Sequence, residues 1–175
     1  MSGDEAGAEA RPGFWRRRVG DPLVSLLAQG LTPEKLALSL AVGFVLGLFP
    51  ILGATTLLCL AAGVAFRLNH VGLQLANHLA YPLQVPLILV FVRLGERLLG
   101  APRVTFDPLT LARQFQRDAS GFLREFGLTG LHGILGWSLV APLLLGAAFF
   151  TLRPVLRRLD AALRRSGRLP ALPAA

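Results

Sequence analysis

The sequence predicts an all-α integral membrane protein. Of its 175 residues, 53% are hydrophobic and only 16% are charged, whereas about a quarter of the residues in a soluble domain are charged. Three runs contain no Asp, Glu, Lys or Arg, namely 36–66, 68–92 and 127–152. Uncharged runs longer than roughly 18 residues are typical of membrane segments. We therefore expect a membrane domain over 21–152, with a Pro/Gly-broken helical hairpin (33–66), spans over 68–92 and 127–152, and one amphipathic interfacial helix (107–126).

The net charge of +8 is concentrated near the ends of the chain. The segment 153–175 carries six arginines and one acid, a local balance of +5. A nucleic-acid binder spreads basic residues over a folded surface, whereas arginines beside a span follow the positive-inside rule. We expect no nucleic-acid partner, a disordered basic lead over 1–20 and a basic tail over 153–175. We then expect a multi-pass membrane protein with both termini on the cytoplasmic side.

The first uncharged run is interrupted at its centre by "LFPILG". Thr32 and Pro33 form a good helix start, because threonine caps free amides and proline fits the first helical position. Pro50 cannot donate a backbone hydrogen bond, and Gly53 tolerates the turn after it. Roughly 25 Å of helix precede the interruption and roughly 20 Å come after it, against a bilayer core of about 30 Å. A hairpin that enters and returns fits better than the alternative, a kinked single span.

Small and polar residues recur at helical spacing in the first two runs. Ser39, Gly43 and Gly47 form a ridge that allows another helix to approach closely, as do Gly72, Ala76 and Ala80. A polar stripe within about a 100° arc of the second run consists of His70, Gln74, Asn77, His78 and Tyr81. Pro82 and Pro86 disturb the helix just beyond the stripe. The predicted polar membrane site comprises Thr55, Thr56, Asn69, His70, Gln74, Asn77, His78, Tyr81 and Gln84, beside the helix break at Pro50 and Gly53.

The segment 107–126 predicts an amphipathic helix that begins at Asp107-Pro108. Its apolar residues share one face, and three arginines lie opposite. Such a helix is suited to the membrane interface, although a helix packed on the protein's own core has the same pattern. The final run, 127–152, is long enough to cross a bilayer.

The segment 32–95 resembles the bacterial membrane proteins of the domain of unknown function 2062 family. The resemblance lies in "LTPEKLALSLAVGFVLGLFPILGATTLLCLAAGVAFRLN", with a proline turn and an "RLGE" segment after it. Its matching positions are Gly43, Gly47, Pro50, Gly53, Thr56 and Asn69. Many members have an Asn-Pro turn where this chain has Tyr81-Pro82. The resemblance implies a protein of the bacterial inner membrane with a broken helix, and it supplies no substrate or reaction.

Catalytic chemistry is not expected, because the apolar part contains no nucleophile with a base and no paired carboxylates. His70 and His78 lie eight residues apart without a third ligand between them, so we predict no metal site and no cofactor. The first functional hypothesis is transport or lipid handling at the broken helix, as in many secondary transporters. Thr55 and Thr56, at the start of the second half-helix, would then present hydroxyls and amides to an anionic group. The alternative is a non-catalytic membrane scaffold or assembly subunit. Expected partners are membrane lipid and either a second copy or another membrane protein.

Overall fold

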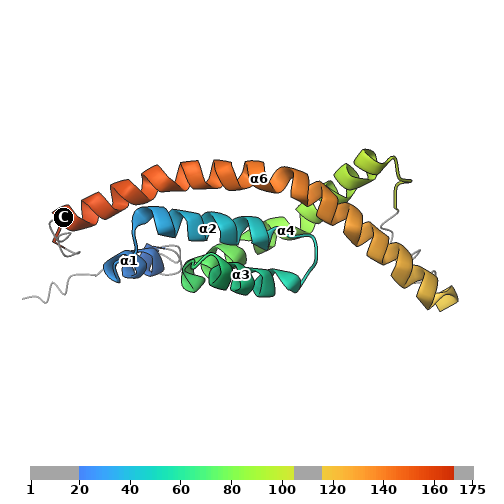
Figure 1. Cartoon of the computed structure of the whole chain (residues 1–175), viewed down its shortest axis with the longest axis horizontal. Helices are drawn as coiled ribbons and strands as arrows, with labels where there is room; N and C mark the ends of the chain where they lie inside the picture. Colours follow the sequence, from blue (N-terminus) through green and yellow to red (C-terminus); the bar gives the residue numbers. More distant parts are fainter. Residues whose placement is uncertain (1–19, 105–115, 168–175) are drawn as a thin grey trace, which may run out of the picture.

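The computed structural model describes residues 20–104 and 116–167 and shows helices there, as the sequence predicts. The described helices are α1 (Asp21–Ala28), α2 (Pro33–Gly47), α3 (Ala54–Ala65), α4 (His70–Leu99) and α6 (Ala119–Arg165). Figure 1 shows an elongated bundle in which α6 extends along the whole length of the molecule and α2 lies beneath it.

α2 and α3 are joined by residues 48–53, which we call the helix break. α2 begins after Thr32, whose Oγ1 accepts a hydrogen bond from the Lys35 N–H at 3.3 Å. The chain leaves helical geometry after Gly47, and α3 begins after Gly53, which has a φ of +85°. Left-handed backbone of this kind favours glycine because it has no Cβ. α3 therefore returns alongside α2 (Figure 1).

The start of α2 and the end of α3 lie at the same end of the molecule. The Ser39 hydroxyl donates to the Lys35 carbonyl at 2.8 Å and accepts from the Asn69 N–H at 3.0 Å. Asn69 also caps α4, because its Oδ1 accepts from the Gly72 N–H at 2.8 Å. Ser39 thus links Lys35, near the beginning of the α2–α3 hairpin, with Asn69, which comes two residues after Arg67.

α4 packs against α2 through the two predicted small-residue ridges. A Cβ at Gly47 would lie 2.8 Å from the Cβ of Ala80, and one at Gly43 would overlap the backbone of Leu73. Gly72 approaches Ser39 in the same way. Because both sets of positions increase together along the chain, α2 and α4 run parallel. α4 remains continuous through Pro82 and Pro86.

α6 is a single helix across both of the boundaries predicted near it. We expected an interfacial helix to end at 126, a span over 127–152 and a separate tail, but α6 continues from Ala119 to Arg165. The predicted boundaries coincided with changes in hydropathy, whereas helical hydrogen bonding depends on the backbone and continues through both. The first part of the predicted 107–126 helix, up to residue 115, lies outside the described residues.

α6 runs antiparallel to α4 and makes backbone-level contacts with it. A Cβ at Gly95 would overlap the backbone of His132, and a Cβ at Gly136 would overlap that of Phe91. Glycine is required at these two crossings because any side chain would separate the helices.

A helix that we did not predict, α1, closes the end where α2 begins. Its Leu26 and Leu27 are buried in a cluster that includes Leu36 from α2 and Leu156 from α6. An ion pair between Glu34 and Arg157 adds a second link between α2 and α6 at this end. The Arg157 guanidinium, hydrogen-bonded to Glu34, lowers the pKa of that carboxyl.

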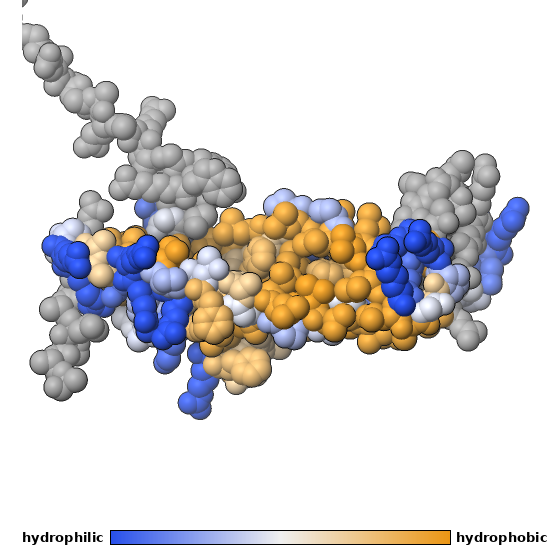
Figure 2. Space-filling view, turned by 90° about the horizontal axis from the view of Figure 1, so that it is seen from above, coloured by the Kyte–Doolittle hydropathy of each residue, from blue (hydrophilic) through white to orange (hydrophobic). Residues whose placement is uncertain are grey.

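The middle of the molecule is covered by exposed apolar side chains, which we call the apolar belt. Figure 2 shows it as a broad hydrophobic surface with hydrophilic residues at both ends. Its members include Leu57 and Val64 on α3, Val85 on α4, and Leu143 and Phe150 on α6, each more than 60% exposed. Among the described residues, α4 and the part of α6 from Phe126 are long and apolar enough to cross a membrane.

Candidate functional site at the helix break

Two backbone carbonyls, one in the helix break and one in the last turn of α2, accept hydrogen bonds from side chains of neighbouring helices. A helix C-terminus leaves its last carbonyls without intrahelical donors, and Pro50 has no N–H. The Gln84 Nε2 of α4 donates to the Phe49 carbonyl at 2.9 Å. The Trp137 Nε1 of α6 donates to the Val45 carbonyl at 3.1 Å. Both long helices therefore fix the geometry of the break.

The Trp137 ring also covers the break. Its centroid lies 5.1 Å from that of Phe49 in an edge-to-face arrangement. A Cβ at Gly133, one turn away on α6, would lie 3.1 Å from the Cβ of Pro50, so a glycine there lets the proline approach. We did not predict Trp137 as a site residue. The available signal was an indole N–H within an uncharged run, because a buried indole usually needs an acceptor.

The predicted polar stripe of α4 divides between two environments. Asn77 is 1% exposed, and Gln84, also in the predicted site, is fully buried. Gln74 is half-buried, whereas His70, His78 and Tyr81 are exposed. A 100° arc is wide enough to extend from a helix–helix contact to the outer surface, which is why residues predicted together face different surroundings.

The inward part of the stripe connects α4 with α3. The Asn77 Nδ2 donates to the Gln74 Oε1 at 3.2 Å, and the Gln74 Nε2 donates to the Thr56 carbonyl at 3.4 Å. Of the two predicted threonines, Thr55 is fully buried and Thr56 is exposed. Thr56 therefore contributes a backbone oxygen to this chain of bonds.

The outward part of the stripe is arranged on one side of α4. The His78 Nδ1 lies 2.6 Å from the Gln74 carbonyl, and the His78 and Tyr81 ring centroids are 5.6 Å apart. Together with Pro22 of α1, His70 and His78 line an open groove on this side of the molecule.

Three buried polar atoms near the break have no hydrogen-bond partner within the described residues. They are Thr55 Oγ1, Asn77 Oδ1 and Gln84 Oε1. Nearly all buried polar atoms in proteins have a partner, including ordered water. The two amide oxygens are acceptors, and the hydroxyl both donates and accepts. These three side chains therefore retain unused hydrogen-bonding capacity that matches a hydroxyl, an amine or a water molecule.

The side chains that commonly bind metals are dispersed in this part of the molecule. No group of three or more His, Cys, Asp or Glu side chains within residues 20–104 and 116–167 is placed to hold a metal ion.

The parallel α2 and α4, the returning α3 and the crossing α6 define a helical bundle built around an interrupted helix. A family model described as "Uncharacterized protein conserved in bacteria (DUF2062)" matches residues 16–165. The chain belongs to this bacterial family, and the match confirms the resemblance seen in 32–95 and extends it over most of the chain. No curated protein and no solved structure shows a significant match.

Proposed function

We propose that the protein is a bacterial inner-membrane protein that transports or handles a lipid-like molecule at the helix break. In this proposal α4 and α6 cross the bilayer, and α2 and α3 enter it and return as a hairpin. The apolar belt supports membrane placement, because large exposed apolar surfaces on a folded chain indicate contact with lipid or with another protein.

The helix lengths support the hairpin. α2 has 15 residues and α3 has 12, which correspond to about 22 Å and about 18 Å. Neither comfortably crosses a core of about 30 Å. The Ser39 bridge between Lys35 and Asn69 places both hairpin ends together, and the Glu34–Arg157 ion pair joins them to the arginine-rich end of α6. This end then faces the cytoplasm by the positive-inside rule.

The observation that carries the proposal is the unused polar capacity of Thr55, Asn77 and Gln84 beside the break. Irregular backbone at membrane depth is tolerated only against protein or in a wet cavity, and here α4 and α6 supply the protein contacts. The remaining acceptors favour a substrate that brings neutral donors, such as hydroxyl groups. The uncharged runs contain no acidic residue, which disfavours coupling to protons or sodium.

Membrane topology is tested by cysteine labelling in a Cys59→Ala background. Single cysteines at Lys35, Arg67 and Arg165 are compared with one at Ala101, at the far end of α4. We expect an impermeant thiol reagent to label the first three from the cytoplasmic side and Ala101→Cys from the other side. Labelling of positions 35 and 67 from opposite sides would show that α2 and α3 form a kinked single span and contradict the hairpin.

The same reagent tests the site in inverted and right-side-out vesicles. We expect cysteines at Asn77 and Gln84 to react if water and substrate reach the break. The matched control is Leu83→Cys, which lies on the exposed apolar side of α4 and should stay unreactive in lipid. Silence at both 77 and 84, with a folded protein, contradicts a path at the break.

A scaffold or assembly subunit is the second candidate, and a specific observation favours it. His70, His78 and Tyr81 are polar and exposed on the uncharged part of α4 (residues 70–92), where the other exposed side chains are apolar. Polar groups facing lipid favour contact with another helix, and each such hydrogen bond contributes on the order of 1 kcal/mol. The candidate predicts that cysteines at 78 and 81 crosslink to a partner or a second copy, while 77 and 84 remain silent.

A further inference from the structure

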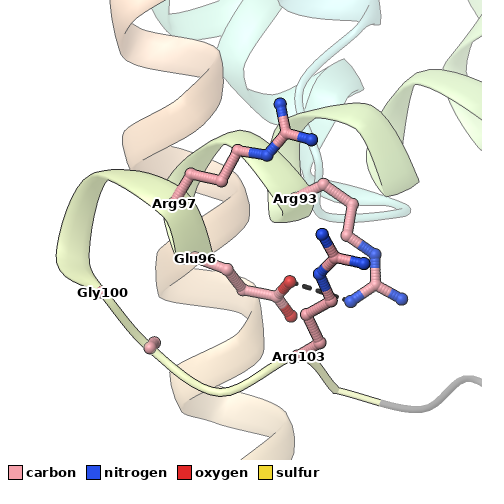
Figure 3. A pocket seen from close by; sticks show the side chains of 6 residues that line it. Arg93, Glu96, Arg97, Gly100 and Arg103 are labelled. Carbon is pink, nitrogen blue, oxygen red and sulfur yellow. Dashed lines mark hydrogen bonds and ion pairs between the residues drawn. The ribbon is translucent and has the colours of Figure 1, made fainter.

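A pocket of about 420 Å³ lies at the far end of α4, where three arginines and one glutamate line it (Figure 3). It is lined by Arg93, Glu96, Arg97, Gly100, Ala101 and Arg103. Its size falls in the range of small-molecule sites, roughly 300–1,000 Å³. With three guanidinium groups and one carboxylate, its formal charge is +2. We call it the α4 pocket.

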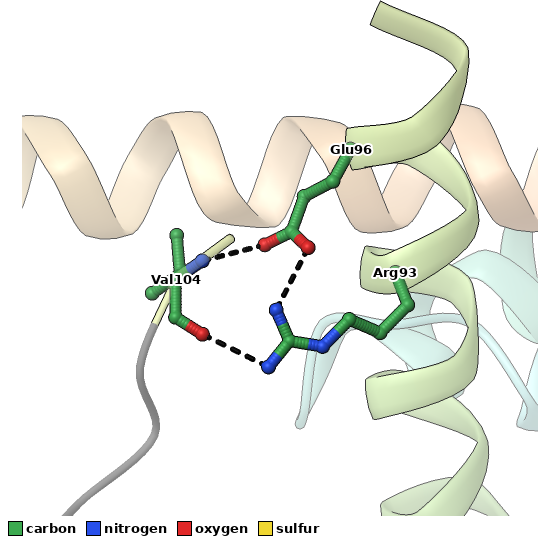
Figure 4. A network of polar contacts seen from close by, with 3 residues as sticks. All are labelled: Arg93, Glu96 and Val104. Carbon is green, nitrogen blue, oxygen red and sulfur yellow. Dashed lines mark hydrogen bonds and ion pairs between the residues drawn. The ribbon is translucent and has the colours of Figure 1, made fainter. Parts of the chain in front are cut away.

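The single acid of the α4 pocket is already neutralised. Glu96 is 2% exposed, and its Oε2 accepts from the Arg93 Nη1 at 2.8 Å. Its Oε1 accepts from the Val104 N–H at 2.9 Å, and the Arg93 Nη2 donates to the Val104 carbonyl at 3.0 Å. Figure 4 shows this closed arrangement, which fastens residues 101–104 to the end of α4. The fastened segment carries Arg103 and forms one wall of the pocket.

The other two arginines keep their charges available. The side chains of Arg97 and Arg103 make no hydrogen bond or ion pair in the part of the chain that the structure describes. Both line the same cavity from different segments, one from the helix and one from the loop (Figure 3). Guanidinium groups bind phosphate oxygens through paired N–H donors. Two such groups facing one cavity are suited to a single phosphate group.

A helix-capping role does not explain these arginines. The end of α4 is closed by its own backbone, because the Ala101 N–H donates to the Glu96 carbonyl at 2.9 Å and the Gly100 N–H to the Arg97 carbonyl at 3.4 Å. Gly100 has the left-handed φ of +61° that this closure uses. The Glu96 and Arg97 carbonyls of the last turn therefore already have backbone donors.

The position of the α4 pocket matches the level of lipid head groups. The uncharged part of α4 from His70 to Val92 spans about 34 Å at 1.5 Å per residue, close to a bilayer core of about 30 Å. The pocket begins at the next residue. Figure 2 shows that hydrophilic residues directly border the apolar belt at this end of the molecule.

We infer that the α4 pocket binds a phosphate group, supplied either by an anionic lipid head group or by free phosphate. Arg97 and Arg103 hold its oxygens, and Arg93 with Glu96 positions the loop. The inference goes beyond the proposed function by adding a second binding site, and it rests on that proposal only for the membrane level of the pocket.

The experiment uses full-length protein in neutral detergent and measures binding by calorimetry. The probes are dihexanoyl phosphatidic acid, dihexanoyl phosphatidylcholine and inorganic phosphate. The test variant is Arg97→Gln/Arg103→Gln, and the control is Arg158→Gln/Arg165→Gln. The control removes the same charge from exposed positions at the other end of α6. Because charge-assisted hydrogen bonds are lost, we expect the test pair to weaken phosphatidic acid binding about tenfold or more, while the control changes it less than about twofold.

The probes distinguish the two phosphate sources. Binding of phosphatidic acid without comparable binding of inorganic phosphate assigns a lipid head group, and equal binding of both assigns free phosphate. If neither phosphatidic acid nor inorganic phosphate binds, the inference is overturned. An equal loss of phosphatidic acid affinity in the test and control variants overturns it as well. Cysteine labelling of the hairpin is measured separately, so a failed topology prediction remains distinguishable from a failed phosphate site.

Discussion

Two proline-containing regions of the molecule behave differently although they contact each other. The helix break contains Pro50, and there the chain leaves helical geometry between Gly47 and Ala54. Pro82 and Pro86 lie four residues apart in α4, which stays helical through both. Between them, Gln84 donates its hydrogen bond to the break. A proline alone therefore does not decide whether a helix ends.

The residues after each proline and the groups around it account for the difference. After Pro50 comes Gly53 in a left-handed conformation. Donors from α4 and α6 bind the carbonyls of Phe49 in the break and of Val45 in the last turn of α2. The rings of Pro82 and Pro86 are exposed, and α4 has helical residues on both sides. A helix ends where a residue can adopt a turn conformation and where other groups donate to its last carbonyls. A helix that continues through a proline requires only a local adjustment of its backbone.

The largest effect is expected from Gln84→Leu, which removes the donor to the Phe49 carbonyl. The structure shows no other donor to this oxygen within the described residues, so the variant should lose about 2 kcal/mol of unfolding free energy. The measurement is unfolding of the purified protein in mixed micelles titrated with a denaturing detergent. His78→Leu is the control, because its side chain is exposed and the Gln74 carbonyl that its ring contacts belongs to the continuous helix α4. Equal losses of unfolding free energy in both variants would show that the hydrogen bond from Gln84 does not specifically stabilise the break.

Gly53→Ala tests the turn itself. A Cβ at this position meets no atom within 4 Å, so its cost reports only the left-handed backbone, about 1–1.5 kcal/mol of unfolding free energy. Gly146→Ala in α6 is the matched control, because its Cβ is also uncrowded and its backbone is helical. It should gain about 0.5–1 kcal/mol. Effects of the same sign at both positions would contradict a conformational requirement at Gly53.

Trp137→Phe is expected to cost less, about 1 kcal/mol. The variant keeps an aromatic ring beside Phe49 and removes the indole N–H. The Val45 carbonyl still accepts from the Leu48 N–H at 3.2 Å, so it does not become unpaired. The measurement is the same unfolding titration, with Phe49→Leu as the test of ring packing. If Phe49→Leu costs as much as or more than Trp137→Phe, the ring contact rather than the hydrogen bond accounts for the contribution of α6.

Local signals in the sequence predict much of this fold. Thr32 and Pro33 predict the beginning of α2, and the spacing of Ser39, Gly43 and Gly47 predicts a close helix contact, because each depends on residues within one or two turns. The family is likewise recognisable from its motif and is confirmed by the match over most of the chain. Local signals do not predict which helix packs against a small-residue ridge or which donor binds a backbone carbonyl, because both depend on packing between distant segments.

The candidate site illustrates that limit. Trp137 and Val45 are 92 positions apart, and no local pattern connects them. The helical wheel grouped Asn77 with His78, but Asn77 is buried where Gly47 of α2 packs against it, and His78 is exposed. The boundaries of α6 were missed for another reason, because hydropathy changes at 126 and 152 while the hydrogen-bonding pattern continues.

The smallest effects are expected when each proline is replaced by alanine. Pro50→Ala frees the unfolded chain and lets Phe49 adopt helical geometry, so it should lose about 0.5–1 kcal/mol of unfolding free energy. Pro86→Ala restores an N–H opposite the Pro82 carbonyl and loses no packing, because the ring is exposed. Its unfolding free energy should therefore stay within about 0.5 kcal/mol of the parent. The unfolding titration measures both variants, and circular dichroism reports any added helix. A greater loss for Pro86→Ala than for Pro50→Ala would show that Pro86 also holds a geometry that the fold requires. The surroundings of Pro50 would then not explain why one helix ends and the other continues.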